Sequence, residues 1–122
     1  MTTVKANGRT YDYIKTIGKG SPGGPGFRHP VHITFWENTI FTLNRGTEGE
    51  PCGRIGVFNF DEDFLGEFSS NGDDDGQFVW GTSIVSDKEG LIYLADEWLN
   101  RISIFNGSVQ FNGENIGQEN FI

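Results

Sequence analysis

The stretch Gly90–Phe105, GLIYLADEWLNRISIF, decides the fold of this chain. It contains two short apolar runs, residues 91–95 and 101–105, separated by a polar loop over residues 96–100. Runs of this length that are rich in branched and aromatic residues and bounded by Gly, Asp and Asn are typical of β-strands. We therefore expect two antiparallel strands here, joined by the polar loop.

The same pattern occurs once before in the chain, which makes it an internal repeat. Four residues reappear 51 positions later as Phe64, Phe68, Phe78 and Ile84, namely Tyr13, Ile17, Phe27 and Ile33. Farther along, Ile40-Phe41 pairs with Ile92-Tyr93, and the run 54–58 pairs with the run 101–105. A unit of roughly 50 residues with four short strands is the sequence signature of a β-propeller blade.

The periodicity predicts an all-β chain without long helices. The strands expected from it lie at 31–36, 39–43, 54–59, 64–68, 82–86, 91–95, 101–105 and 108–111, with an additional leading strand at 13–17. Turns are expected at Glu37-Asn38, at 61–63, at 88–90 and at Asn106-Gly107, which is a strong two-residue hairpin signal.

The second copy resembles an NHL repeat, through Asp75-Gly76-Gln77-Phe78, the run 90–96 and Asn100–Phe105. The first copy resembles it more loosely, and it has Asn44 where the second copy has Asp96. The resemblance implies antiparallel four-stranded blades of an incomplete NHL-type β-propeller. Family members close five or six blades into a ring, so this chain would supply about two.

The resemblance also implies a division of the chain. Residues 1–12 would be an N-terminal extension and 13–111 the propeller blades, with a leading outer strand at 13–17, blade one at about 27–68 and blade two at about 78–111; residues 112–122 would be a C-terminal tail. Two blades leave apolar faces open. We expect the missing blades of a longer chain to cover these faces, with self-association as the alternative.

Charge and composition exclude several classes of partner. The formal net charge is −8, and the nine Lys and Arg are scattered among seventeen Asp and Glu, so no basic stripe exists to bind nucleic acid. The N-terminal residues form no apolar run, so we expect neither a secretory signal nor a membrane segment, and a cytoplasmic protein by default. The single cysteine, Cys52, cannot form an internal disulfide.

Loops that leave one face of the propeller are the expected binding surface. The residues that we expect to line this rim are Arg28, His29, Arg45, Asp73, Asp74, Asp75, Trp80 and Trp98. Tryptophan and arginine are enriched among residues that dominate binding energy. Packing between blades is the alternative role for both Trp80 and Trp98, and for Trp80 the two roles are equally supported.

Two patterns suggest metal ligands, and in both cases a structural role is the better interpretation. The run Asn71–Gly76 imitates the start of a calcium loop, but position twelve is Thr82 and small polar residues also suit a solvated turn, so no cofactor is predicted and Ca²⁺ is the weaker alternative. His29 and His32 lie three apart on an extended segment, so their side chains point to opposite faces. In the amidating-lyase members of the NHL family that use histidines in the central channel, the histidine directly follows the proline. Here the residue after Pro30 is Val31.

The remaining repeat positions are expected to stabilise the blades, and no catalytic residue is predicted. These positions are Phe27, Pro30, Phe78, Asp96, Asn100 and Arg101. For Asp96 and Arg101 we expect a salt bridge or a carboxylate-to-backbone bond that holds the loop. The function expected is a non-catalytic binding module for a protein or small ligand; the alternative is a fragment of a metal-dependent propeller enzyme of the amidating-lyase or lactonase kind.

Overall fold

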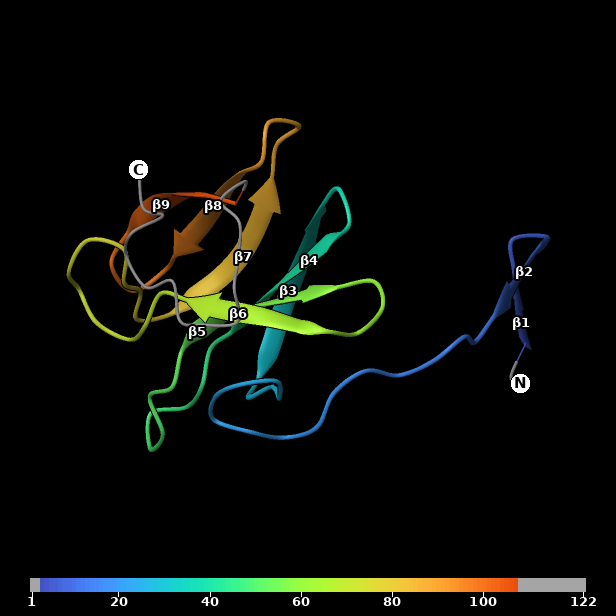
Figure 1. Cartoon of the computed structure of the whole chain (residues 1–122), viewed down its shortest axis with the longest axis horizontal. Helices are drawn as coiled ribbons and strands as arrows, with labels where there is room; N and C mark the ends of the chain where they lie inside the picture. The colour runs from blue at the N-terminus through green and yellow to red at the C-terminus, as the bar shows by residue number, and fades with distance from the viewer. Residues whose placement is uncertain (1–2, 108–122) are drawn as a thin grey trace.

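The computed structural model describes residues 3–107 and shows nine strands in this range (Figure 1). The strands are β1 (Thr3–Ala6), β2 (Arg9–Asp12), β3 (Pro30–Trp36), β4 (Thr39–Asn44), β5 (Arg54–Asn59), β6 (Phe64–Phe68), β7 (Gly81–Ser86), β8 (Leu91–Asp96) and β9 (Arg101–Asn106). For β3 to β9 the bounds expected from the sequence agree to within one residue. No helix in the described range is long and apolar enough to cross a membrane.

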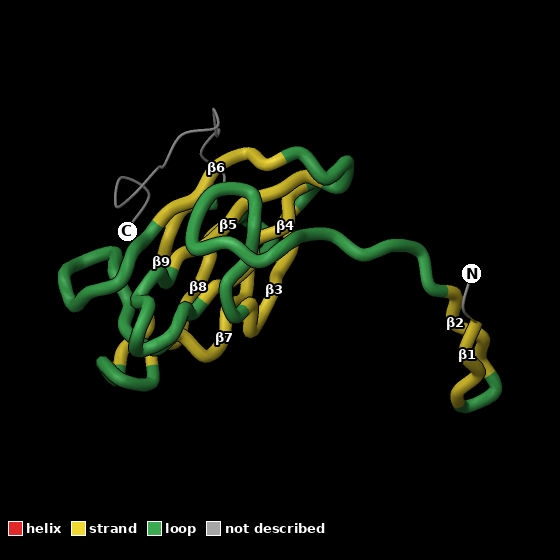
Figure 2. The backbone as a smooth tube through the Cα atoms, turned by 90° about the horizontal axis from the view of Figure 1, so that it is seen from below, coloured by secondary structure: helices red, strands yellow, loops and turns green. Residues whose placement is uncertain are grey.

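The nine strands pair only in antiparallel fashion, and the described residues confirm an all-β fold class. The strands form a two-stranded sheet β1-β2, a four-stranded sheet β3-β4-β5-β6 and a three-stranded sheet β7-β8-β9. We call the last two sheet one and sheet two; they stack on each other, while the hairpin β1-β2 stands apart (Figures 1 and 2). Residues 3–107 do not close into a ring of sheets.

The N-terminal hairpin is a feature that the sequence interpretation missed. Asn7 and Gly8 both have positive φ, 50° and 75°, as a two-residue turn of the type I′ class requires. Val4 pairs with Tyr11 across this turn. The signal was the dipeptide Asn-Gly. The second such dipeptide does not give the predicted turn within the described residues, because Asn106 belongs to β9 and the residues after Gly107 lie outside that range.

The predicted leading strand at 13–17 is wrong for this structure. Tyr13 to Ile17 pair with no other strand; they run between β2 and the loop that precedes β3. A strand exists only when its backbone groups find a partner, and apolar spacing alone does not supply one. The predicted fourth strand of the second copy, 108–111, and the tail 112–122 lie outside the described residues.

The core lies between the two stacked sheets. Sheet one contributes Phe41, Leu43, Ile55, Val57 and Phe68, and sheet two with its preceding loop contributes Phe78, Ile84, Ile92, Leu94 and Phe105; all ten have a relative exposure of 0%. Phe68 on β6 packs against Phe105 on β9, with ring centroids 5.0 Å apart. Alternating residues of each sheet therefore meet face to face, as the period of two demands.

Hydrogen bonds join the first strands of the two sheets. His32 Nδ1 accepts a bond of 2.7 Å from the backbone N–H of Ile84. The hydroxyl groups of Thr34 and Ser86 lie 2.8 Å apart, and the Ser86 hydroxyl also donates to the carbonyl oxygen of Phe35. These contacts fix β3 beside β7, so the loops at the ends of both strands are held in one arrangement.

Candidate functional site

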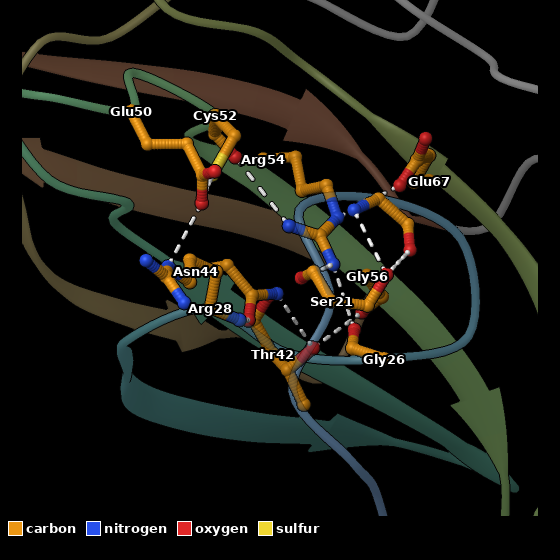
Figure 3. Close-up of polar contacts among 11 residues, drawn as sticks. Ser21, Gly26, Arg28, Thr42, Asn44, Glu50, Cys52, Arg54, Gly56 and Glu67 are labelled. Carbon is orange, nitrogen blue, oxygen red and sulfur yellow. Dashed lines mark hydrogen bonds and ion pairs between the residues drawn. The ribbon is translucent and has the colours of Figure 1, made fainter.

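Arg54 anchors the long loop that precedes sheet one. Its side chain is nearly buried, and its Nη2 donates to the carbonyl oxygens of Gly26 at 2.7 Å and Ser21 at 3.3 Å (Figure 3). On its other side, Nε lies 2.9 Å from a carboxylate oxygen of Glu67 on β6. The buried charge is thus balanced, and charge-assisted hydrogen bonds tie the loop to β5.

Arg101 does the same for the loop that precedes sheet two. Its guanidinium donates to the carbonyl oxygens of Asp73, Asp74 and Gln77 at 2.9 to 3.2 Å. The loop Ser69–Phe78 is therefore held through its backbone, and the exposed carboxylates of Asp73 and Asp74 are not needed for that purpose.

Asp96 and Asn44 occupy equivalent positions at the ends of β8 and β4. The carboxylate of Asp96 accepts hydrogen bonds from the backbone N–H groups of Val79, Trp80, Trp98 and Leu99 at 2.7 to 3.2 Å. Asn44 accepts only from the N–H of Arg28, and its Nδ2 donates back to Thr42. Asp96 thus binds the backbone of two segments, the one before β7 and the one after β8. It fixes the positions of Trp80 in the first and Trp98 in the second.

A cleft of about 480 Å³ opens where these loops meet. We call it the rim cleft; it is lined by Arg45, Thr47, Glu48, Pro51, Asn71, Val79, Trp80, Glu97 and Trp98. The guanidinium carbon of Arg45 lies 4.0 Å from the centre of the Trp80 ring. Trp98 is 72% exposed, the largest exposed aromatic surface among the described residues. The cleft therefore offers aromatic surface next to a cation, a combination that suits ligand binding.

The charged groups of the rim cleft are not paired with each other. Arg45 Nε is buried and has no hydrogen-bond partner among the described residues. Glu48 and Glu97 also line the cleft and are exposed. A buried donor without a partner costs free energy, and no ion pair of Arg45 among the described residues offsets that cost.

The structure brings together three of the eight predicted rim residues, Arg45, Trp80 and Trp98. Arg28 instead forms an ion pair with Glu50, at 2.9 Å between Nε and Oε1 (Figure 3). His29 is exposed, has a positive φ of 52°, and its carbonyl oxygen accepts a bond from the N–H of Arg45. The carboxylates of Asp73, Asp74 and Asp75 are exposed and do not line the cleft.

The residues that could hold a metal are scattered over the described chain. No group of three or more His, Cys, Asp or Glu side chains within residues 3–107 is arranged to hold an ion. In the loop Ser69–Phe78, which carries the three aspartates, the side-chain amide of Gln77 accepts a hydrogen bond from the N–H of Asp74 and donates one to the hydroxyl of Ser70. His32 already uses Nδ1 to join the two sheets.

The repeat positions differ in burial between the two copies. Phe78 is fully buried between the sheets, whereas the equivalent Phe27 is half-buried and lies 5.3 Å from Phe58, centroid to centroid. Pro30 is exposed and begins β3 opposite Asn44. Asn100 has a positive φ of 55° in the turn before β9, a conformation that asparagine tolerates better than most residues.

Sequence reasoning identified the loops of the rim cleft but missed most of the side chains that complete it. Those missed are Thr47, Glu48, Pro51, Asn71, Val79 and Glu97. Their only signal was membership of the loops that follow β4 and β8 and precede β7. Which loop residues face the cleft depends on the hydrogen bonds of Asp96 and Arg101. The sequence predicted that these residues hold the loop between them, but not that Asp96 also accepts from Val79 and Trp80.

One pair of ionisable groups has shifted pKa values, and it lies at the opposite end of β7 from the rim cleft. Burial alone would raise the pKa of Asp87, but hydrogen bonds from the N–H of Leu91, the hydroxyl of Tyr93 and backbone N–H groups of the turn outweigh this and lower it. The hydrogen bond to Asp87, together with burial and the nearby negative charge, raises the pKa of Tyr93. This pair stabilises the turn between β7 and β8.

Two backbone features recur at equivalent positions of the two copies of the repeat. The bridge between Gly20 and Phe27 recurs as that between Asn71 and Phe78, and the register shift at Pro30/His32 recurs at Gly81/Ser83. No protein-family model matches the chain, and no curated protein matches it. What carries a functional interpretation is therefore the geometry of the rim cleft and of the two sheets.

Proposed function

We propose that this chain is two successive blades of an NHL-type β-propeller whose rim loops form a non-catalytic binding module. The ligand is a protein or a small molecule held in the rim cleft. The blade interpretation is supported by the four-stranded antiparallel order of sheet one and by the equivalent contacts of Arg54 and Arg101, each of which ties a strand to the loop that precedes its sheet.

The observation that carries the binding function is the pairing of Arg45 with Trp80 beside the exposed Trp98. A planar guanidinium that is stacked on an indole keeps its edge free for a ligand acceptor. Arg45 forms no ion pair among the described residues, so its charge is not neutralised by a neighbouring carboxylate. Trp98 supplies apolar area at a low entropic cost, as binding anchors do.

A binding role is favoured over catalysis by what the side chains already do. His32, one of the two histidines considered as metal ligands, has its Nδ1 engaged with the backbone N–H of Ile84. Asp96, the most buried carboxylate near the cleft, has its two oxygens occupied by four backbone N–H groups. Catalysis requires an acid or base with a free position toward the substrate, and the carboxylate of Asp96 has none.

The test begins with a selection of binders to the folded chain from a displayed peptide library and, for small ligands, a fragment screen by ligand-observed NMR. Affinities of the binders are then measured for the wild type and for Arg45→Ala, Arg45→Lys and Trp98→Ala. We expect losses of about tenfold or more, equivalent to about 1.4 kcal/mol. Arg45→Lys keeps the charge but lacks the planar stacked group, so it too should lose affinity.

Lys88→Ala and Glu89→Ala are the matched controls, because both residues are exposed in the turn at the other end of β7. These variants should bind as the wild type does. Binders that do not distinguish the cleft variants from the turn variants would show that the rim cleft is not the binding surface.

A further inference from the structure

Each of the two stacked sheets has one apolar face buried and a second apolar face open. On sheet one, the open face carries Ile33, 47% exposed, and Phe35, 50% exposed. On sheet two, it carries Val85, 52% exposed, and Ile102, 66% exposed. Contiguous exposed apolar surface on a soluble chain marks a site of interaction.

The open face of sheet one is equivalent to the buried face of sheet two. The repeat aligns four buried residues of sheet two, Ile84, Ile92, Leu94 and Phe105, with Ile33, Ile40, Thr42 and Phe58. Those four line a groove of about 340 Å³ on sheet one, together with Phe27, the counterpart of the buried Phe78. The groove is thus the same kind of surface that sheet two presents to sheet one.

The open face of sheet two, in turn, is equivalent to the buried face of sheet one. The residues of sheet one that pack onto sheet two include Phe41, Leu43, Ile55 and Val57, and the repeat aligns them with Tyr93, Ala95, Ile102 and Ile104. Pairing brings Tyr93 beside Ile104 and Ala95 beside Ile102, so these four form one patch. The chain therefore carries both halves of an interface that it already forms once internally.

We propose that copies of this chain stack head to tail, with the open face of sheet two of one copy seated in the groove on sheet one of the next. The occupant of the groove is a second copy because the patch that fits it is present on the chain itself. The interface is heterologous, so assembly continues until it closes into a ring or forms a filament. This stacking is independent of what the rim cleft binds.

One edge of the groove is already occupied by the segment before β3. Ile17 lines the groove, and the repeat aligns it with Phe68, which packs on sheet two from β6. Lys15 lines the groove as well and forms an ion pair with Glu62 at 2.7 Å. Ile17 thus takes the place of one residue of the missing neighbour and leaves Ile33 and Phe35 for the second copy.

The test compares two single variants, Ile33→Asp and Ile102→Asp, by light scattering coupled to size-exclusion chromatography. The wild type should form species of at least two 13.6 kDa copies at high concentration and dissociate on dilution. Each variant alone should stay monomeric, since a charge blocks one of its two faces. Mixed together, they should form a one-to-one dimer that grows no further, because one intact groove and one intact patch remain.

Three outcomes would overturn the proposal: a wild type that stays monomeric at every concentration, an Ile102→Asp variant that still dimerises through its grooves, or a mixture that does not associate. Val4→Asp is the matched control, since Val4 is 55% exposed on the separate hairpin and should not affect association. Circular dichroism checks that each variant is folded. Phe35→Asp and Val85→Asp provide a second pair on the same two faces.

Discussion

Arg45 and Trp80, which are 35 positions apart in the sequence, are stacked with 4.0 Å between the guanidinium carbon and the centre of the indole ring. Arg45 follows β4 of sheet one and Trp80 precedes β7 of sheet two. The contact therefore crosses from one sheet to the other, and it depends on β3 and β7 being held side by side. It makes the rim cleft a property of the two-sheet unit.

The two tryptophans of the rim cleft should differ in their effect on stability. Trp98→Ala should leave the melting temperature nearly unchanged, because the side chain is already 72% exposed. Trp80→Ala should lower it, because Trp80 is half-buried beneath Arg45 and its loss removes the stacked contact as well. Differential scanning calorimetry of dilute samples measures both. Equal melting temperatures for the two variants would mean that Trp80 has no packing role.

Replacement of Asp96 should destabilise the chain more than its position at the end of a strand suggests. Asp96→Ala leaves four backbone N–H groups without their acceptor, and we expect a loss of about 2–4 kcal/mol in the free energy of unfolding. Asp96→Asn should cost less, since one oxygen remains and can keep the three bonds from Trp80, Trp98 and Leu99, while the amide N–H₂ would face the N–H of Val79. Urea denaturation measures all three proteins.

Asp73→Ala is the matched control for Asp96, because its carboxylate is exposed. Its free energy of unfolding should stay within about 0.5 kcal/mol of the wild type. If Asp96→Ala were no less stable than Asp73→Ala, the carboxylate would not be what holds the loop.

The equivalent phenylalanines of the two copies, Phe27 and Phe78, should contribute unequally to the free energy of unfolding. Phe78→Ala should cost about 3–5 kcal/mol, because the ring is fully buried in the core between the sheets. Phe27→Ala should cost clearly less in the monomer, since Phe27 lines the open groove. Urea denaturation at low protein concentration measures the difference. Equal losses of stability for the two variants would show that both phenylalanine rings are equally buried in the monomer.

Stability should fall in acid through Asp87. Its pKa is lowered on folding, so the stabilisation is fully present above the unfolded-state value of about 3.9 and is lost as the pH falls through the lower folded value. Asp87→Asn lacks the ionisable carboxyl group, so the stability of this variant should depend less on pH over the range in which Asp87 becomes protonated. Thermal unfolding across a pH series compares the two proteins, and parallel curves would contradict the assignment.

Stability should fall in alkali through Tyr93. Its pKa is raised on folding, so its contribution is fully present below the unfolded-state value of about 10 and is lost as the pH rises through the folded value. Tyrosinate absorbance should show one late-titrating group, which Tyr93→Phe removes. In the same variant the Asp87 carboxyl should titrate at a higher pH by carbon-13 NMR, because it loses a donor.

The sequence by itself determined the strands and their repetition. Alternation and short apolar runs placed β3 to β9 within one residue, because side chains on a half-buried strand must alternate between core and solvent whatever the sheet packs against. The 51-residue spacing also paired Phe27 with Phe78, and a shorter spacing of 47 residues farther along the chain paired Arg54 with Arg101. These features depend on residues that are close together in the sequence, so they can be predicted from the sequence alone.

Only the tertiary structure decided which faces are covered and which loop residues meet. The apolar spacing of residues 13–17 predicts a strand, yet none forms, because a strand also needs a partner for its backbone. Phe27 and Phe78 match in sequence but differ in burial, since only one of them has a sheet on top of it. The rim cleft likewise required the stacking of sheet one on sheet two, which brings Arg45 to Trp80; packing between distant segments has no counterpart in local sequence pattern.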